Sequence, residues 1–422
     1  MASDVVHIEK KASFESLDRI STLPIEIIDE IFQFMPIREA VKTSWLSRSW
    51  RYKWMSMPNL VFDPQFIDLV NFVNNILRLH NGMISKFEVN EFVEKECPYV
   101  DEWILVLQRK NVKHLVLKFN EYRSPVYDVP TCLFSCQTLC KLKLQGCILN
   151  LPTQYKGFRN LTDLELVFVT ITNQSFENLV AKIPLLRRLS IWNCESLTCF
   201  NISAPNLKTV RLCGVFESIN WRNTPNVGIA TLATRRPSGS GPTTIVCKLD
   251  DVLGGLSGVR CMVIRHPFLE FLSMDTAPKR LAIDFDLLRY LKLFVNFQDM
   301  KQIVAVLCLC RSSPRLEVLD ITVVWSGQSL LLYEKTFWEA LLQKEKKIFG
   351  RLEYVVLVGF MGGQRELQFI QFVLQNSSML KTFKIQWTKP ALSQDEKLHA
   401  VEKMMQFERS SAKAKVIFSN RI

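Results

Sequence analysis

The sequence predicts an α/β protein, in which a small helical unit at the N-terminus precedes a long array of strand-and-helix repeats. Apolar residues near the N-terminus recur at spacings of three and four, which is a helical pattern. Most of the remaining chain repeats one short apolar strand pattern, mostly at steps of 20 to 30 residues. Apolar residues make up 48% of the chain and charged residues 22%, a composition typical of folded proteins.

The N-terminal unit is expected to contain three helices. The first begins near Pro24, which suits a first helical turn, and Pro36 breaks it and can start a second helix over residues 37–46. A third, short helix would carry Trp50 and Trp54, which are four residues apart. Three helices in so few residues bury only a thin core, so the unit is expected to need a partner surface.

A longer amphipathic helix is predicted over residues 64–82. It ends at Asn81 and Gly82, a pair that commonly terminates helices. We expect this helix to cover the open end of the structure that follows.

The repeat is the pattern apolar-x-x-apolar-x-apolar. Its copies, one of them degenerate, begin at Ile84, Val112, Leu139, Leu161, Leu186, Leu207, Val227, Val259, Leu288, Leu316, Leu352 and Leu380. Each copy reads as a strand whose alternate residues share one face, and it can bury that face only against a neighbouring copy. The pattern predicts a leucine-rich-repeat solenoid with a parallel sheet on its concave side. Its equivalent positions Leu115, Leu142, Leu164 and Leu189 should form one buried row.

Two segments of the chain resemble a known family. The plant form of the F-box motif is similar to the run LPIEIIDEIFQFMPIREAVKTSWLSRSWRYKW, although Trp45 and Ser49 replace the usual small aliphatic and basic residues. Residues 349–422 have a strand, a Gly-x-x-Gly turn from Gly359 to Gly362, an acidic helix and further strands, and they resemble the FBD region of plant F-box/FBD/LRR-repeat proteins. The resemblance implies an F-box at 17–60, a capping helix or linker at 61–83, leucine-rich repeats at 84–348 and an FBD region at 349–422.

The resemblance also implies a function. In this family the F-box docks on the Skp-type adaptor of cullin–RING ubiquitin ligases, so the chain would be a non-catalytic substrate receptor of an SCF-type (Skp–cullin–F-box) E3 ubiquitin ligase. Its repeats would bind a target protein whose identity the sequence does not reveal. Carried over position by position, the adaptor-binding set is Leu23, Pro24, Ile27, Ile28, Ile31, Met35, Pro36, Val41, Leu46, Ser47 and Trp50.

The target is expected on the concave face, where residues between the apolar strand positions point away from the core. The candidate cations there are Lys141, Lys143, Arg188 and Arg211. A competing hypothesis is a ligase-independent scaffold, for example for nucleic acid, because the net charge is +12. Lys and Arg are spread along the whole chain, however, which favours general solubility over a nucleic-acid partner.

No catalytic, cofactor or metal site is predicted. Cys132, Cys136 and Cys140 lack the usual ligand spacing, and the sequence contains neither C-x-x-C nor G-x-S-x-G. The longest apolar run, 303–310, is too short to cross a bilayer, so no membrane span is expected. The N-terminus lacks the apolar core of a secretory signal, and the 12 cysteines read as reduced core residues. We therefore expect a nuclear or cytoplasmic protein.

Overall fold

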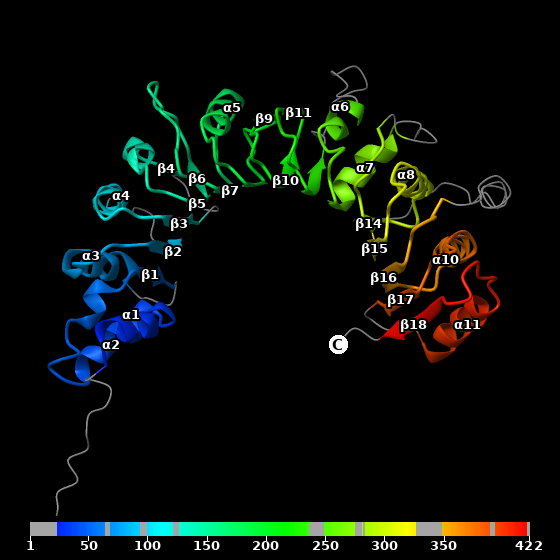
Figure 1. Ribbon diagram of the computed structural model, residues 1–422, viewed down its shortest axis with the longest axis horizontal. Helices are drawn as coiled ribbons and strands as arrows, with labels where there is room; N and C mark the ends of the chain where they lie inside the picture. Colours follow the sequence, from blue (N-terminus) through cyan, green and yellow to red (C-terminus); the bar gives the residue numbers. More distant parts are fainter. Residues whose placement is uncertain are drawn as a thin grey trace, which may run out of the picture.

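The protein forms an arc of parallel strands (Figure 1). This computed structural model describes residues 23–63, 68–92, 99–120, 126–235, 249–274, 281, 283–325, 348–388 and 393–419. The strands line the inner, concave side of the arc, and the helices from α3 to α11 stand on its outer side (Figure 1). In this part of the chain, no helix has the length and apolar character needed to cross a membrane.

The N-terminal unit begins with two α-helices, α1 (Ile25–Gln33) and α2 (Ile37–Lys42). Each starts directly after a proline, whose carbonyl oxygen accepts the first backbone hydrogen bonds of the helix. The second helix is shorter than predicted, because the chain tightens into the 3₁₀ helix η1 (Thr43–Trp45). The two proline breaks predicted from the sequence are confirmed.

The predicted third helix is present only as a short 3₁₀ helix, which carries Trp54 but not Trp50. The segment that follows η1 consists of turns and a short 3₁₀ helix, η2 (Lys53–Ser56). Serine side chains bond locally here: Ser44 donates to the carbonyl oxygen of Arg51 at 3.0 Å, and the hydroxyls of Ser47 and Ser49 lie 2.7 Å apart. Such local bonds compete with helix formation, and the two tryptophans of the predicted helix are buried without it.

One parallel sheet contains fourteen strands of the described residues, and each strand pairs with its neighbours along the chain. In order these are β1 (Asn59–Phe62), β2 (Lys86–Phe92), β3 (His114–Phe119), β5 (Lys141–Gln145), β7 (Asp163–Val167), β8 (Arg188–Trp192), β10 (Thr209–Val215), β12 (Ile229–Arg235), β13 (Cys261–Ile264), β14 (Tyr290–Val295), β15 (Val318–Val323), β16 (Tyr354–Phe360), β17 (Thr382–Trp387) and β18 (Lys415–Ser419). Every strand predicted from the repeat pattern is present, including the degenerate copy, which is β12.

The outer side of the arc is built from helices and two small sheets. The helices are α3 (Leu69–Leu79), α4 (Val100–Arg109), η3 (Thr131–Ser135), α5 (Asn173–Ala181), α6 (Leu249–Gly254), α7 (His266–Met274), α8 (Met300–Arg311), α10 (Gln364–Asn376) and α11 (Gln394–Met405). The small sheets pair β4 (Tyr127–Asp128) with β6 (Cys147–Ile148), and β9 (Cys199–Ser203) with β11 (Ser218–Arg222). Helix α3 starts later than predicted, at a cap where the Asp68 carboxylate accepts the backbone N–H of Asn71 at 3.2 Å.

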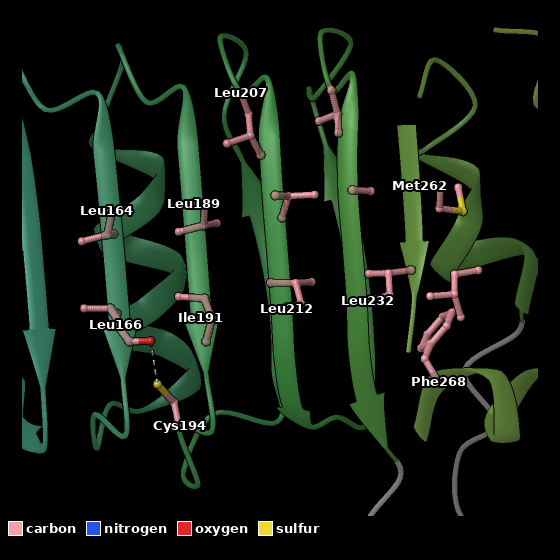
Figure 2. Close-up of a cluster of buried hydrophobic side chains, with 14 of the residues drawn as sticks. Leu164, Leu166, Leu189, Ile191, Cys194, Leu207, Leu212, Leu232, Met262 and Phe268 are labelled. Atoms are coloured by element: carbon pink, nitrogen blue, oxygen red, sulfur yellow. Dashed lines mark hydrogen bonds between the residues drawn. The ribbon is translucent and has the colours of Figure 1, made fainter. Parts of the chain in front are cut away.

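The core is a set of continuous rows of apolar side chains between the sheet and the outer layer. Strand register puts Leu115, Leu142, Leu164 and Leu189 in one row, as predicted, and all four are buried. A second row runs through Leu166, Ile191, Leu212 and Leu232 (Figure 2). Each strand therefore buries its apolar face only with the help of both neighbours.

The C-terminal turn predicted from the glycine spacing begins inside the end of β16, where Gly359 falls at a register shift against β17, and continues to α10. Gly359 and Gly362 have φ values of 84° and 76°, in a region that strongly favours glycine. The Glu366 carboxylate accepts the backbone N–H groups of Gly363 at 2.8 Å and of Met361 at 3.1 Å. Burial nevertheless raises the pKa of Glu366 to about 7, because desolvation outweighs these hydrogen bonds.

Candidate functional site

The first helix of the N-terminal unit has one buried face and one exposed face. Ile28 and Phe32, one helical turn apart, are fully buried, and the Phe32 ring meets that of Trp50 edge to face at 6.1 Å. Ile27 and Ile31, each one residue earlier, lie on the other side of the helix and are exposed. The inner face therefore holds the unit together, and the outer face is free to contact another molecule.

Among the side chains of this unit that the structure describes, six large apolar ones are exposed. They are Ile27, Ile31, Phe34, Trp45, Leu46 and Tyr52, called here the N-terminal apolar group. Phe34 is 89% exposed and Trp45 is 84% exposed. Isolated exposed apolar residues are ordinary, but so many in one short unit indicate a surface that binds a partner.

The predicted adaptor-binding residues fall into three groups. Exposed members are Pro24, Ile27, Ile31, Pro36 and Leu46, and half-buried members are Leu23, Met35, Val41 and Ser47. Ile28 and Trp50 are buried in the core of the unit. The last two residues support the surface from beneath and cannot contact a partner without rearrangement.

Three members of the N-terminal apolar group were not among the predicted site residues: Phe34, Trp45 and Tyr52. The signal for Phe34 was its spacing, because it follows Ile27 and Ile31 on the same helical face. Trp45 stood out only as a departure from the motif. Its exposure shows that the large ring is not needed for the core of the unit.

The N-terminal unit is joined to the repeats by packed structure. The His80 ring Nε2 lies 2.8 Å from the carbonyl oxygen of Met57, and Lys110 Nζ donates to the carbonyl oxygens of His80 at 2.9 Å and Gly82 at 3.1 Å. Gly82 passes so close to Ser56 that an added Cβ would lie 2.9 Å from the Ser56 carbonyl oxygen. Burial lowers the pKa of His80, so the ring is neutral near pH 7. Strand β1 continues the unit directly into the sheet.

The four predicted target-binding cations all lie on strands of the concave face, but their environments differ. Lys143 Nζ is 2.7 Å from a Glu165 carboxylate oxygen on the neighbouring strand, and Arg188 forms an ion pair with Asp163. Lys141 and Arg211 are exposed, and neither forms an ion pair with a carboxylate of the described residues. The strand register thus pairs two of the four cations, Lys143 and Arg188, with carboxylates on a neighbouring strand.

The cysteines that could suggest a metal site are Cys132, Cys136 and Cys140. Burial raises the pKa of the Cys136 thiol to about 12, which disfavours the thiolate that a metal would need. Over the ranges that the structure describes, His, Cys, Asp and Glu side chains form no group of three that could hold a metal ion.

This architecture, a small proline-punctuated helical unit fused to a parallel array of leucine-rich strands, defines an F-box protein with leucine-rich repeats. Comparison with known proteins agrees. The F-box domain family matches residues 20–62, the leucine-rich repeats of FBD-associated F-box protein At5g56370 match residues 100–321, and the FBD family matches residues 350–385.

The chain is similar to proteins of the plant Arabidopsis thaliana over most of its length. The chain is 31% identical to F-box/FBD/LRR-repeat protein At1g13570, over 96% of this chain and 99% of that protein. It is 23% identical to F-box/LRR-repeat protein 13, over 89% of this chain and 90% of that protein. The chain belongs to the family of F-box/FBD/LRR-repeat proteins.

Proposed function

We propose that this protein is the substrate-recognition subunit of an SCF-type E3 ubiquitin ligase. Its F-box would dock on the Skp-type adaptor, and through the adaptor on the cullin–RING ligase, while the repeats bind the target protein. The observation that supports this proposal is the N-terminal apolar group, which lies within the segment matched by the F-box family. Such a group of exposed rings and aliphatic side chains suits a stable protein interface.

Adaptor contact would come from the exposed members of the predicted set, with Phe34, Trp45 and Tyr52 added. The half-buried Leu23 would contribute its exposed edge, beside Pro24 at the start of α1. The buried Ile28 and Trp50 would act indirectly, because they fix the angle at which α1 presents its outer face.

The receptor itself would perform no covalent chemistry. Holding the adaptor at one end and a target on the array raises the effective concentration of target lysines near the transferring enzyme. We place the protein in the nucleus or cytoplasm. The ten described cysteines are all free thiols, which fits a reducing compartment.

The target would bind on the concave face. Of the four predicted cations, Lys141 and Arg211 are the better candidates for direct contact, because the charges of Lys143 and Arg188 are already paired. Joint reversal of Lys141 and Arg211 to Glu should weaken target capture and leave adaptor binding unchanged. If the wild-type chain and this variant capture a crosslinked or proximity-labelled target equally well, Lys141 and Arg211 are excluded from the target site.

The decisive experiment is purification of the full chain with a Skp-type adaptor. We expect a stable complex at a one-to-one ratio that assembles with a cullin–RING pair. A matched variant with Leu23→Ala and Pro24→Ala should lose the adaptor. Absence of adaptor binding, together with salt-dependent binding to a polynucleotide, would instead favour a ligase-independent scaffold.

A further inference from the structure

The concave face changes in chemical character along the arc. On β2 to β8 its outward positions are largely charged: Lys86, Glu88, His114, Lys141, Lys143, Asp163, Glu165 and Arg188. On β12 to β16 the corresponding positions are largely apolar. The C-terminal concave patch is defined here as Ile229, Cys261, Val263, Tyr290, Phe294, Val318, Tyr354, Val356 and Val358.

The patch is continuous because strand register aligns its members. Ile229, Cys261, Tyr290, Val318 and Tyr354 are successive partners in one row across five strands. The two ends of this row, Ile229 and Tyr354, are each 43% exposed, and the residues between them are half-buried. An apolar row of this length on a concave surface indicates a site for another molecule.

The centre of the patch holds one polar cluster whose charges cancel. Lys292 Nζ lies 2.9 Å from Asp320 Oδ2, and the Tyr290 hydroxyl donates to the same oxygen at 2.8 Å. The ammonium and the carboxylate are therefore already partnered within the patch. The middle of the patch is close to neutral and presents mainly aliphatic and aromatic groups.

Cations stand on both sides of the patch. Arg211 on β10 lies before the first strand of the patch, and Lys384 on β17 and Lys415 on β18 lie beyond its last strand. Arg265 directly follows β13 and therefore lies within the span of the patch itself. The Arg265 guanidinium lies 5.2 Å from the centre of the Phe294 ring. Within the described ranges, none of the four cations forms an ion pair with a carboxylate.

We propose that the C-terminal concave patch binds a segment of the target protein that has an apolar centre and acidic residues at both ends. Apolar burial would provide most of the affinity, and the flanking cations would select the acidic ends. This inference specifies the target class of the proposed function and rests on it only in calling the partner the ligase target.

Strand spacing sets the size of the bound segment. Neighbouring strands are about 4.8 Å apart, so β12 to β16 span about 19 Å, the length of roughly six extended residues. From β10 to β17 the span is about 29 Å, or roughly nine extended residues. The acidic ends should therefore be separated by an apolar run of about six residues.

The surface fits other ligands less well. A nucleic acid needs positive charge along its whole path, whereas the middle of this patch is apolar and its one lysine is paired. A bilayer cannot follow the inside of an arc (Figure 1). These two ligand classes become outcomes of the test below.

The test begins with selection from a random 16-residue peptide library on the immobilised full chain. We expect enrichment of sequences that have an apolar run flanked by Asp or Glu. A fluorescein-labelled copy of the most enriched peptide is then titrated by fluorescence anisotropy. Tyr354→Asp and, on a different strand, Ile229→Asp should each weaken its binding at least tenfold. The matched control is Leu287→Asp, because Leu287 is 41% exposed but lies in the turn before β14, outside the patch.

The role of charge is tested separately by joint replacement of Arg211 and Lys384 with Glu. This change should lower the affinity for the same peptide and reduce the salt dependence of its binding. The proposal would be overturned if the selection enriched no peptides or enriched basic ones. It would also be overturned if the chain bound a polynucleotide or anionic vesicles more strongly than the peptide, or if Tyr354→Asp and Ile229→Asp bound the peptide as the wild-type chain does. Adaptor titration of the same proteins separates the two hypotheses. Normal adaptor binding without peptide binding refutes this site alone, and peptide binding without adaptor binding refutes the ligase role alone.

Discussion

Phe34→Ala is expected to weaken adaptor binding strongly without destabilising the protein. The ring is 89% exposed, so its loss leaves no cavity in the core. A phenylalanine side chain can bury roughly 150 to 200 Å², which at ~25 cal/mol per Å² corresponds to about 4 kcal/mol. Alanine retains part of this area, so the expected loss is about 2 to 3 kcal/mol, or roughly 30- to 150-fold in Kd.

The assay is a titration of labelled Skp-type adaptor with the full chain at fixed salt, accompanied by thermal unfolding of each protein. Leu79→Ala is the matched control, because Leu79 is 52% exposed at the end of α3, outside the N-terminal apolar group. The control should bind the adaptor as the wild-type protein does. An unchanged Kd for Phe34→Ala, with the fold intact, would refute the assignment of this surface to the adaptor.

Three further predictions concern the helix start, the core and the C-terminal turn. Joint replacement of Leu23 and Pro24 by Ala should cost several kcal/mol of adaptor binding, measured by pull-down titration, while the repeats remain folded. Leu164→Ala should lower the free energy of unfolding by about 2 to 5 kcal/mol in urea denaturation, and a value near zero would contradict its place in the buried row. The pKa of Glu366 is near 7 when folded and near 4.5 when unfolded, so its protonated form stabilises the fold below about pH 4.5 and this contribution is lost as pH rises through 7. The Tm of Glu366→Gln, whose side chain stays neutral, should therefore vary less between pH 5 and 8 than the Tm of the wild-type protein. The same dependence of Tm on pH in both proteins would show that Glu366 is not the titrating group.

The repeat pattern predicted the main sheet well because each strand must supply inward apolar residues at fixed positions to fill a continuous row. The small sheet of β9 and β11 was missed, although Phe200 and Ile202 alternate with polar residues as in a strand. Strand β1 was also missed, since its four residues are too few to stand out and span the predicted boundary between the F-box and the linker. Short strands depend on their neighbours more than on their own pattern.

The candidate sites were predictable by position but not by orientation. The motif treats Ile27 and Ile28 alike, and only packing of α1 against Trp50 decides that one is exposed and the other buried. Likewise, Lys143 was chosen as a free cation, and only the structure shows that it forms an ion pair with Glu165 on the neighbouring strand. The C-terminal concave patch was missed because its members are far apart in sequence and become neighbours only across strands.

The hydrogen bonds that tie His80, Met57, Lys110 and Gly82 together fix the first unit relative to the sheet. No hinge separates the two, because strand β1 pairs with β2 immediately after the last turn of the unit. In a ligase receptor built this way, the reach from adaptor to target is a property of the folded chain and not of a tether. Which lysines of a bound target receive ubiquitin would then be decided by their distance and direction from the array, largely independently of the sequence around each lysine.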